Sequence, residues 1–245
     1  MPAVRTVSAT RYVTPLREGG SLPGLVEADD DGLYVLKFRG AGQGPKALAA
    51  ELVAGEVARA LGLPIPELVF VELDPALGAA EPDPEIQDLI AASGGTNLGM
   101  DFLPGALPFT PKLPPEPELA ADVVWFDAFV LNVDRTPRNP NLLRWHHRLW
   151  LIDHGAALYV HHAPGDPVAR AGDRFPAIRD HVLLPFAGSI ADADARLAPR
   201  IDAGRLAAVV DELPEAWADR AAYAAHLTAR HADRAGFVEE AESAR

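Results

Sequence analysis

Asp134, Asn139 and Asp153 have side chains whose types and spacing could bind a metal ion and activate a hydroxyl group. Asn139 lies five positions after Asp134, and Asp153 lies nineteen positions after it, at the end of an apolar segment. Carboxylate and amide oxygens are hard ligands that suit Mg²⁺, with phosphate oxygens completing the shell. Any one of these residues could instead cap a turn or a helix, as Asp and Asn commonly do. The spaced set favours metal and phosphate chemistry.

Two β-prone segments, 141–145 and 148–152, would bring these residues together. Only two histidines separate the segments, a spacing typical of a β-hairpin, although Asn-Gly is the favoured sequence for such a turn. If the turn centres on the histidines, Asn139 and Asn141 lie beside Asp153 at the open end of the hairpin. Asn141 is therefore an alternative or additional metal ligand.

Lys37 stands out in the predicted strand 33–38 because it shares a face with the apolar residues Leu33 and Val35. Burial of an unpaired ammonium is costly, so this lysine should have a carboxylate partner. The alternative is a lysine at the end of a strand whose amine reaches water.

A helix predicted at 46–61 supplies the partner, since Pro45 suits its first turn and Gly62-Leu63-Pro64 its end. Glu51 lies on a stripe of small residues that allows another element to approach closely, and we expect it to pair with Lys37. Glu56 is followed three positions later by Arg59 and is expected to form a solvated surface pair.

The remaining sequence predicts a β-rich first part and a helical second part. The proline-rich connector 104–117 is the best domain boundary. Asp127, on the helix that begins near residue 116, is expected to be a surface or capping acid. His161-His162 fit a loop better than a metal pair because adjacent side chains point apart. Further β structure is expected at 11–27 and 65–73, and helices at 84–93, 201–213 and 216–241.

Composition excludes several classes of protein. The chain has 22 basic and 35 acidic residues, which argues against direct nucleic-acid binding or attachment to an anionic membrane. No apolar stretch is long enough to span a membrane, and the N-terminus lacks the apolar core of a signal peptide. The absence of cysteine excludes disulfides and thiol chemistry. A soluble cytoplasmic protein is the expectation.

Taken in order, Lys37, Glu51, Asp134, Asn139 and Asp153 make the chain resemble the HipA-like kinases, over roughly residues 15–160. The catalytic segment of that family reads Asp-x-His-x-x-Asn, and its helix-to-strand segment is similar to residues 51–66. The Asp134-Arg135 pair is also similar to the phosphoinositide kinases. The resemblance implies an α+β, bilobal protein-kinase-like fold with a β-rich N-lobe at 1–104 and a mostly helical C-lobe at 105–245.

The resemblance also implies an ATP- and Mg²⁺-dependent phosphotransferase. Lys37 would contact the phosphates, with Glu51 as its ion-pair partner. Asp134 would orient the attacking hydroxyl and accept its proton, and Asn139, Asp153 and Asn141 would bind Mg²⁺. A glycine turn at Gly19, Gly20 and Ser21 would cover the phosphates, although a plain β-turn is the other interpretation of this segment. The hinge that meets adenine would be Met100, Asp101, Phe102 and Leu103.

Two positions depart from the family pattern. Thr136 replaces the histidine of the catalytic segment, and His154 replaces the phenylalanine of Asp-Phe-Gly. The acceptor hydroxyl would belong to Ser or Thr of a partner protein, to a small molecule or to the protein itself. The alternatives are a nucleotide-binding pseudokinase with a regulatory role, or transfer of AMP on the same fold. A metal hydrolase using His161-His162 is remote.

Overall fold

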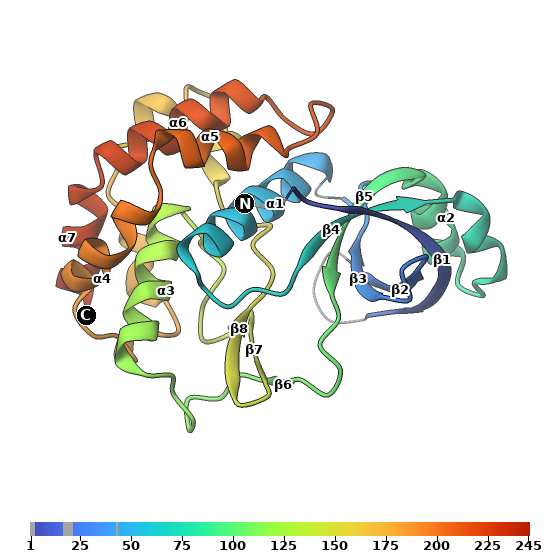
Figure 1. The fold of residues 1–245 in the computed structure, drawn as a ribbon, viewed down its shortest axis with the longest axis horizontal. Coiled ribbons are helices and arrows are strands. Elements are labelled where there is room, and N and C mark those ends of the chain that lie inside the picture. The colour runs from blue at the N-terminus through green and yellow to red at the C-terminus, as the bar shows by residue number, and fades with distance from the viewer. Residues whose placement is uncertain (1–2, 17–21, 43) are drawn as a thin grey trace.

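The computed structural model describes residues 3–16, 22–42 and 44–245 of the chain (Figure 1). The first part of the chain forms a closed barrel with the strand order β1-β2-β3-β5-β4. Strand β1 runs parallel to β4, and the other neighbouring strands are antiparallel. The barrel strands are β1 (Thr6–Pro15), β2 (Gly24–Ala28), β3 (Leu33–Lys37), β4 (Leu68–Leu73) and β5 (Gly95–Asp101).

Strand β3 presents Lys37 on the face that points away from the barrel interior. Tyr34 and Leu36 are buried inside the barrel, whereas Leu33, Val35 and Lys37 are half-buried on the opposite face. Alternate residues of a strand point to opposite sides, so the predicted alternation is confirmed.

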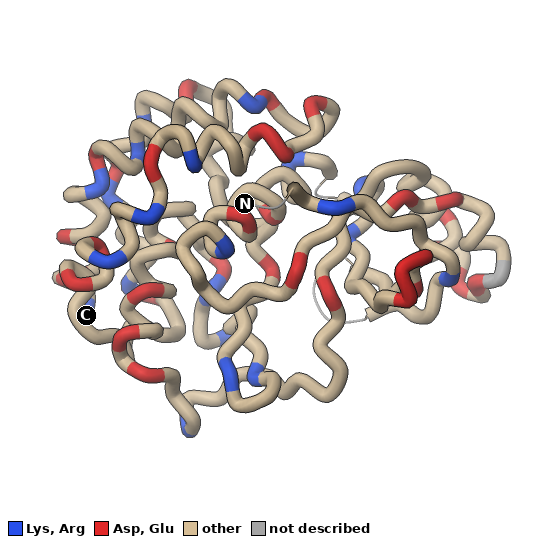
Figure 2. The backbone as a smooth tube through the Cα atoms, viewed as in Figure 1, with Lys and Arg blue, Asp and Glu red and all other residues tan. Residues whose placement is uncertain are grey.

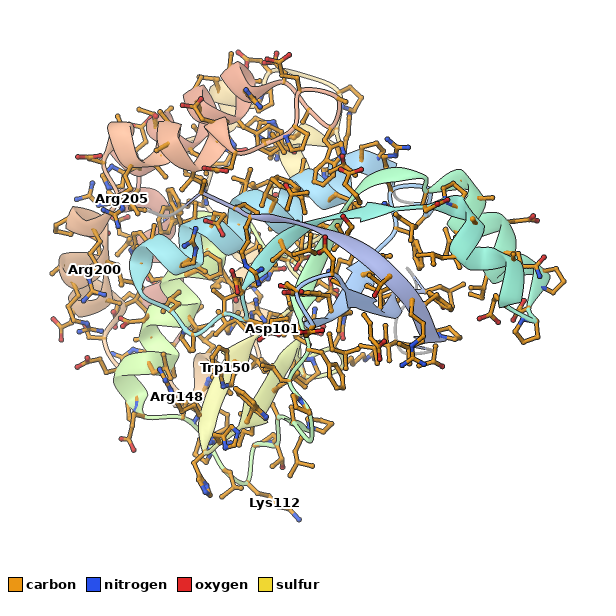
Figure 3. The ribbon with its side chains drawn as sticks, turned by 45° about the vertical axis from the view of Figure 1, so that its right-hand side comes forward. Asp101, Lys112, Arg148, Trp150, Arg200 and Arg205 are labelled. Atoms are coloured by element: carbon orange, nitrogen blue, oxygen red, sulfur yellow. The ribbon has the colours of Figure 1, made fainter. Side chains whose placement is uncertain are left out.

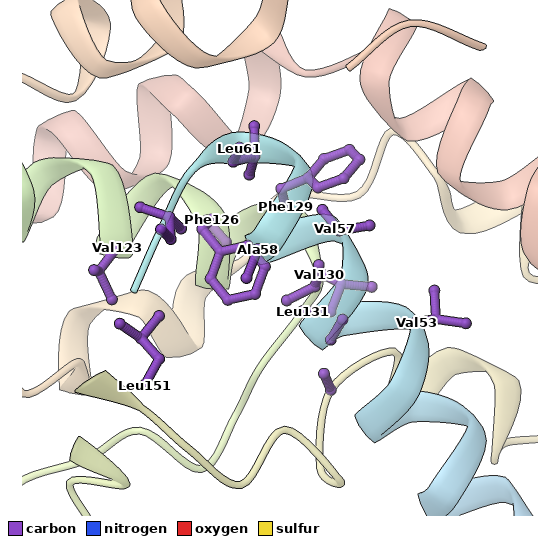
Figure 4. Packing of buried hydrophobic residues seen from close by; sticks show 14 of the residues in the cluster. Val53, Val57, Ala58, Leu61, Val123, Phe126, Phe129, Val130, Leu131 and Leu151 are labelled. Atoms are coloured by element: carbon purple, nitrogen blue, oxygen red, sulfur yellow. The ribbon is translucent and has the colours of Figure 1, made fainter. Parts of the chain in front are cut away.

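Helix α1 (Gly44–Leu61) is buried along most of its length between the barrel and the C-terminal helices (Figure 1). The helix ends at Gly62, whose φ of 80° is a left-handed value that glycine adopts without strain. Val57 and Ala58 pack in one hydrophobic cluster with Phe126, a residue of the helical part (Figure 4). Helix α1 thus packs against both parts of the fold.

Glu56 is not the solvated surface residue that its spacing from Arg59 suggested. Its exposed fraction is 2%, and Arg59 Nε donates to Glu56 Oε2 at 3.0 Å. Burial raises the pKa of Glu56 although Arg59 acts in the opposite direction. The prediction was wrong because α1 packs against α5 (Ala203–Asp211) as well as against the barrel, which covers more than one helix face.

The predicted hairpin forms with the predicted register, since Leu142 pairs with Leu151 and Trp145 with Arg148. The turn residues His146 and His147 have φ of 47° and 63°. Left-handed backbone at both positions is what a two-residue hairpin turn of type I′ requires. A short strand from the proline-rich connector joins the hairpin in a three-stranded sheet of order β6-β7-β8. These strands are β6 (Leu107–Pro108), β7 (Leu142–Trp145) and β8 (Arg148–Leu151).

Helices make up most of the second part. Helix α3 (Pro117–Phe129) leads into the loop that carries Asp134. The predicted helix at 216–241 is two helices that meet near Asp233, so that Tyr223 of the first and Phe237 of the second can both be buried. The other helices are α2 (Pro84–Ala92), α4 (Ile190–Leu197), α6 (Arg220–Ala232) and α7 (Ala235–Ala244). Short 3-10 turns occur at Pro75–Ala80, Tyr159–His161, Val168–Arg170, Pro176–Asp180, Leu184–Phe186 and Ala198–Arg200.

The α+β class is confirmed, with a β-rich first part and a helical second part. The boundary after residue 104 stays a prediction, and one hydrophobic cluster extends across it from α1 to α3. Acidic residues lie on both parts (Figure 2), in keeping with the net charge of −13. No helix within the described residues is long and apolar enough to cross a membrane.

Candidate active site

Lys37 lies between two carboxylates that come from different parts of the fold. Its Nζ is 2.5 Å from Glu51 Oε2 on α1 and 2.6 Å from Asp153 Oδ1, two residues after β8. The side chain of Glu51 is 1% exposed and that of Asp153 is 44% exposed. Glu51 therefore fixes the lysine from inside the protein, whereas Asp153 remains accessible from solvent.

Glu51 is ionised in this environment. Burial opposes its ionisation, but the ammonium of Lys37 and the neighbouring His154 outweigh burial and lower the pKa of Glu51 to about 2. The backbone N–H of His154 donates to Glu51 Oε2 at 2.7 Å, which also ties the segment after Asp153 to α1. Burial acts to lower the pKa of Lys37, but the two carboxylates raise it overall.

We expect this pKa shift to appear in the pH dependence of stability. The folded-state pKa of Glu51 is about 2 against an ordinary value of 4.5, so its contribution is fully present above pH 4.5 and is lost as the pH falls towards 2. The shift corresponds to about 3 kcal/mol. Denaturant unfolding of wild type and Glu51→Gln across this pH range should show a shallower acid loss in the variant.

The control is Glu85→Gln, at an exposed position on α2. This variant should keep the wild-type loss of stability in acid. An equally steep loss in Glu51→Gln and wild type would contradict the assignment of the shift to Glu51.

Both asparagines contact Asp134. Asp134 Oδ2 accepts from Asn139 Nδ2 at 2.8 Å and from Asn141 Nδ2 at 3.3 Å. The other carboxylate oxygen, Oδ1, accepts no hydrogen bond from the described residues. The side-chain carbonyl oxygens of Asn139 and Asn141 are likewise without a donor in the described part of the chain. Amide and carboxylate oxygens of this kind, together with Asp153 Oδ2, are the ligand types that a divalent cation such as Mg²⁺ prefers.

Behind this loop lies a buried ion pair that sequence reasoning missed. Asp127 was expected to be a surface or capping acid, but its exposed fraction is 0%, and Arg135 Nε donates to its Oδ2 at 2.5 Å. His181 Nε2 lies 2.8 Å from the same oxygen, and Asn132 Nδ2 donates to Oδ1 at 2.9 Å. Burial opposes ionisation of Asp127, but Arg135 and His181 outweigh it and hold its pKa well below the usual range. The sequence feature that could have indicated its burial is that Asp127 is a single carboxylate within an apolar segment of α3.

A cavity of about 540 Å³ opens beside Lys37 and Asp153, between the barrel and the hairpin. The predicted hinge, Met100, Asp101, Phe102 and Leu103, forms part of its wall, and Asp101 is seen where the barrel approaches the hairpin (Figure 3). The backbone N–H of Leu103 has no partner among the described residues, so it is free to bind a ligand. Apolar walls come from Val35 on the barrel side and from Leu143 and Ile152 on the hairpin side. A volume of this size lies within the range of small-molecule sites.

The predicted phosphate turn of Gly19, Gly20 and Ser21 lies outside the described residues. The residues on either side of it, Leu16 and Pro23, line the cavity and are joined by a hydrogen bond of 2.7 Å from Leu16 N to Pro23 O.

The adjacent histidines do not form a metal site within the described part of the chain. His161 ends a 3-10 turn, and its Nε2 lies 3.0 Å from His226 Nδ1. Across the described ranges, no group of three or more His, Asp and Glu side chains is arranged to hold a metal ion.

The fold is that of the protein kinases. The chain is similar to the structure of CtkA, a proinflammatory kinase of Helicobacter pylori, with a TM-score of 0.62 at 13% identity over 98% of this chain and 97% of that chain. It is similar to Golgi casein kinase with a TM-score of 0.57 at 12% identity, covering 98% and 74% of the two chains. A structure of Golgi casein kinase with Mn/ADP bound gives a TM-score of 0.54 at 12% identity and the same coverage. At such low identities these likenesses establish the protein-kinase-like fold alone.

The family follows from the sequence itself. The model of the HipA-like kinases matches residues 10–166, so the chain belongs to the HipA-like kinase family and is a kinase. The resemblance seen in the sequence is thereby confirmed. No protein of curated function matches the sequence.

Proposed function

We propose that the protein transfers the γ-phosphate of ATP, with Mg²⁺, to a hydroxyl group, and that the acceptor is Ser or Thr of a protein. The observation that carries this proposal is the placement of Lys37 between Glu51 and Asp153 at the edge of the cavity. A lysine that pairs with a helix carboxylate beside a metal-binding aspartate is the arrangement by which kinases hold nucleotide phosphates.

The cavity would take adenine between the barrel and the hairpin. The unpartnered Leu103 N–H would donate to the base, and Val35 and Ile152 would contact its two faces. The phosphates would then extend towards Lys37. Asp153 Oδ2 and the amide oxygens of Asn139 and Asn141 would hold Mg²⁺, which when bound neutralises phosphate charge.

Asp134 would act on the acceptor. Its Oδ2 is occupied by the two asparagine amides, which leaves Oδ1 to accept a hydrogen bond from the acceptor hydroxyl. The hydroxyl oxygen would form a bond to the γ-phosphorus while the bond from that phosphorus to the bridging oxygen of ADP breaks. The proton of the hydroxyl would pass to Asp134.

Thermal unfolding with ATP and Mg²⁺ tests the proposed nucleotide site. A ligand at a hundredfold excess over its Kd stabilises the folded state by about 2.7 kcal/mol, so the wild-type midpoint should rise. The rise should require the metal and should be lost in Asp153→Ala, because Lys37 keeps Glu51 but the metal loses its carboxylate ligand. Asp88→Ala, at an exposed position on α2, should behave as wild type. A wild-type midpoint that ATP and Mg²⁺ leave unchanged would contradict the proposal.

A further inference from the structure

We propose that Arg135 is a positioning residue that holds the Asp134 loop and the metal-binding end of the hairpin in one fixed arrangement. The inference rests on the proposed phosphotransfer function, because the residues that Arg135 would position are the proposed base and metal ligands. Arg135 itself would touch neither nucleotide nor metal. Arg135 is 1% exposed, whereas its neighbour Asp134 is half-buried.

The guanidinium of Arg135 contacts three separate segments of the chain. It donates through Nε and Nη2 to the two carboxylate oxygens of Asp127 on α3, at 2.5 and 3.4 Å. Its Nη1 donates to the backbone carbonyl of Asn141, which precedes β7, and to that of Ile152, which follows β8, the latter at 3.3 Å. One side chain therefore links helix α3 to both strands at the open end of the hairpin.

One of the two carbonyls belongs to a residue with left-handed backbone, and the other directly precedes such a residue. Asn141 and Asp153 have φ of 49° and 55°, left-handed values that cost free energy in residues other than glycine and persist only when surrounding contacts impose them. Arg135 donates hydrogen bonds to the carbonyl of Asn141 and to that of Ile152, the residue directly before Asp153. The strained conformations at two proposed metal ligands are thus held by the residue next to the proposed base.

The same ion pair reaches the segment that follows the site. Leu183 N donates to His181 Nδ1 at 3.1 Å, so His181 presents its Nε2 proton to Asp127. The backbone N–H of Val182 donates to the carbonyl of Arg135 at 3.0 Å. Residues 181–183 are therefore tied to the Asp134 loop through Asp127 and through the backbone carbonyl of residue 135.

Lysine cannot replace this arginine, although it keeps the positive charge. The planar fork of arginine donates in several directions at once, whereas a lysine amine is a single point. Arg135→Lys can keep its ion pair with Asp127 but cannot also hold both hairpin carbonyls. Groups that orient metal ligands without touching the metal typically change metal affinity or activity by about 10- to 100-fold when mutated.

Arg230 offers a matched control. It is also a fully buried arginine that donates to backbone carbonyls. It lies on α6, and none of its hydrogen bonds to the described residues goes to residues 132–141 or to the hairpin. Its partners are the carbonyls of Phe129, Ala171, Asp173 and Ala128, at 2.7 to 3.0 Å. Arg230→Lys should lose a comparable set of hydrogen bonds without disturbing the site.

The experiment measures, for each variant, the Mg²⁺ concentration at half-maximal stabilisation by ATP and the rate of ADP formation. Arg135→Lys should need about tenfold more Mg²⁺ and turn over about 100-fold more slowly, with the loss in kcat rather than in KM for ATP. Arg230→Lys should keep the wild-type values of both. Wild-type Mg²⁺ dependence and turnover in Arg135→Lys, or equal losses in Arg230→Lys, would overturn the inference.

A second variant covers the case in which Arg135→Lys fails to fold. Replacing both charges together, in Asp127→Leu/Arg135→Met, leaves no unpaired buried ion, a change that is often tolerated. Asn132 and His181 lose the carboxylate that accepts from them, which is the structural cost of this variant. This variant should fold and still show the raised Mg²⁺ requirement, since the hairpin carbonyls have lost their donor. A folded double variant with wild-type turnover would overturn the inference. Failure of the proposed function would be visible separately. In that case ATP and Mg²⁺ would not stabilise the wild-type protein, and the wild-type protein would not form ADP.

Discussion

Asp134→Ala is expected to slow phosphoryl transfer by about 10²- to 10⁴-fold, the usual contribution of a positioned proton acceptor. Nucleotide binding should survive, because the proposed metal ligands Asn139, Asn141 and Asp153 all remain. The initial rate of ADP formation and the midpoint of thermal unfolding with ATP and Mg²⁺ measure the two effects separately. The expected result is a variant with very low activity whose folded state ATP still stabilises.

The matched control is again Asp88→Ala, which removes an exposed carboxylate on α2 and should leave the rate unchanged. Full activity in Asp134→Ala would exclude this residue as the proton acceptor. Loss of nucleotide stabilisation together with activity would show instead that Asp134 serves mainly to hold the two asparagines.

Lys37→Met is expected to reduce both turnover and stability. Removing one preorganised charge from an active site typically costs about 10²- to 10³-fold in rate. The same change leaves Glu51, whose side chain is 1% exposed, without its cation, and breaking a buried pair from one side costs about 3 kcal/mol or more. Steady-state kinetics and denaturant unfolding measure the two losses.

A double variant separates the two roles of the lysine. Lys37→Met/Glu51→Met removes both buried charges, so stability should largely return while activity stays lost. Lys112→Met is the control, because Lys112 lies far out beyond the hairpin (Figure 3) and has no ion pair with any described residue. A Lys37→Met variant as stable as wild type would show that Glu51 does not depend on this cation.

Much of the candidate site could be predicted because it rests on local patterns. The hairpin register follows from two β-prone segments with two residues between them, and it brings Asn141 and Asp153 to one end. The pairing of Lys37 with Glu51 follows from a lysine on an apolar strand face and an acid on a helix stripe of small residues. In both cases the partner lies on an element whose periodicity is visible in the sequence.

What could not be predicted depends on how distant elements cover one another. Asp127 was expected to be a surface or capping acid and Glu56 a surface acid. Helices α3 and α1 are enclosed by packing, so both carboxylates are buried and paired. Local spacing also did not reveal that Arg135 would reach the carbonyl of Ile152. These contacts join segments whose proximity is created only by the complete fold.

Phosphotransfer by this protein is tested most directly by following the phosphorus atoms of ATP. The wild-type protein is incubated with Mg²⁺ and with ATP that is labelled at either the α- or the γ-phosphate. The acceptors tested are the protein itself and candidate partner proteins. We expect the γ-label to appear on an acceptor while ADP is released, and Asp134→Ala to abolish the transfer. Transfer of the α-label with release of pyrophosphate would instead establish AMP transfer, and nucleotide binding without transfer of either label would contradict phosphotransfer and indicate a pseudokinase.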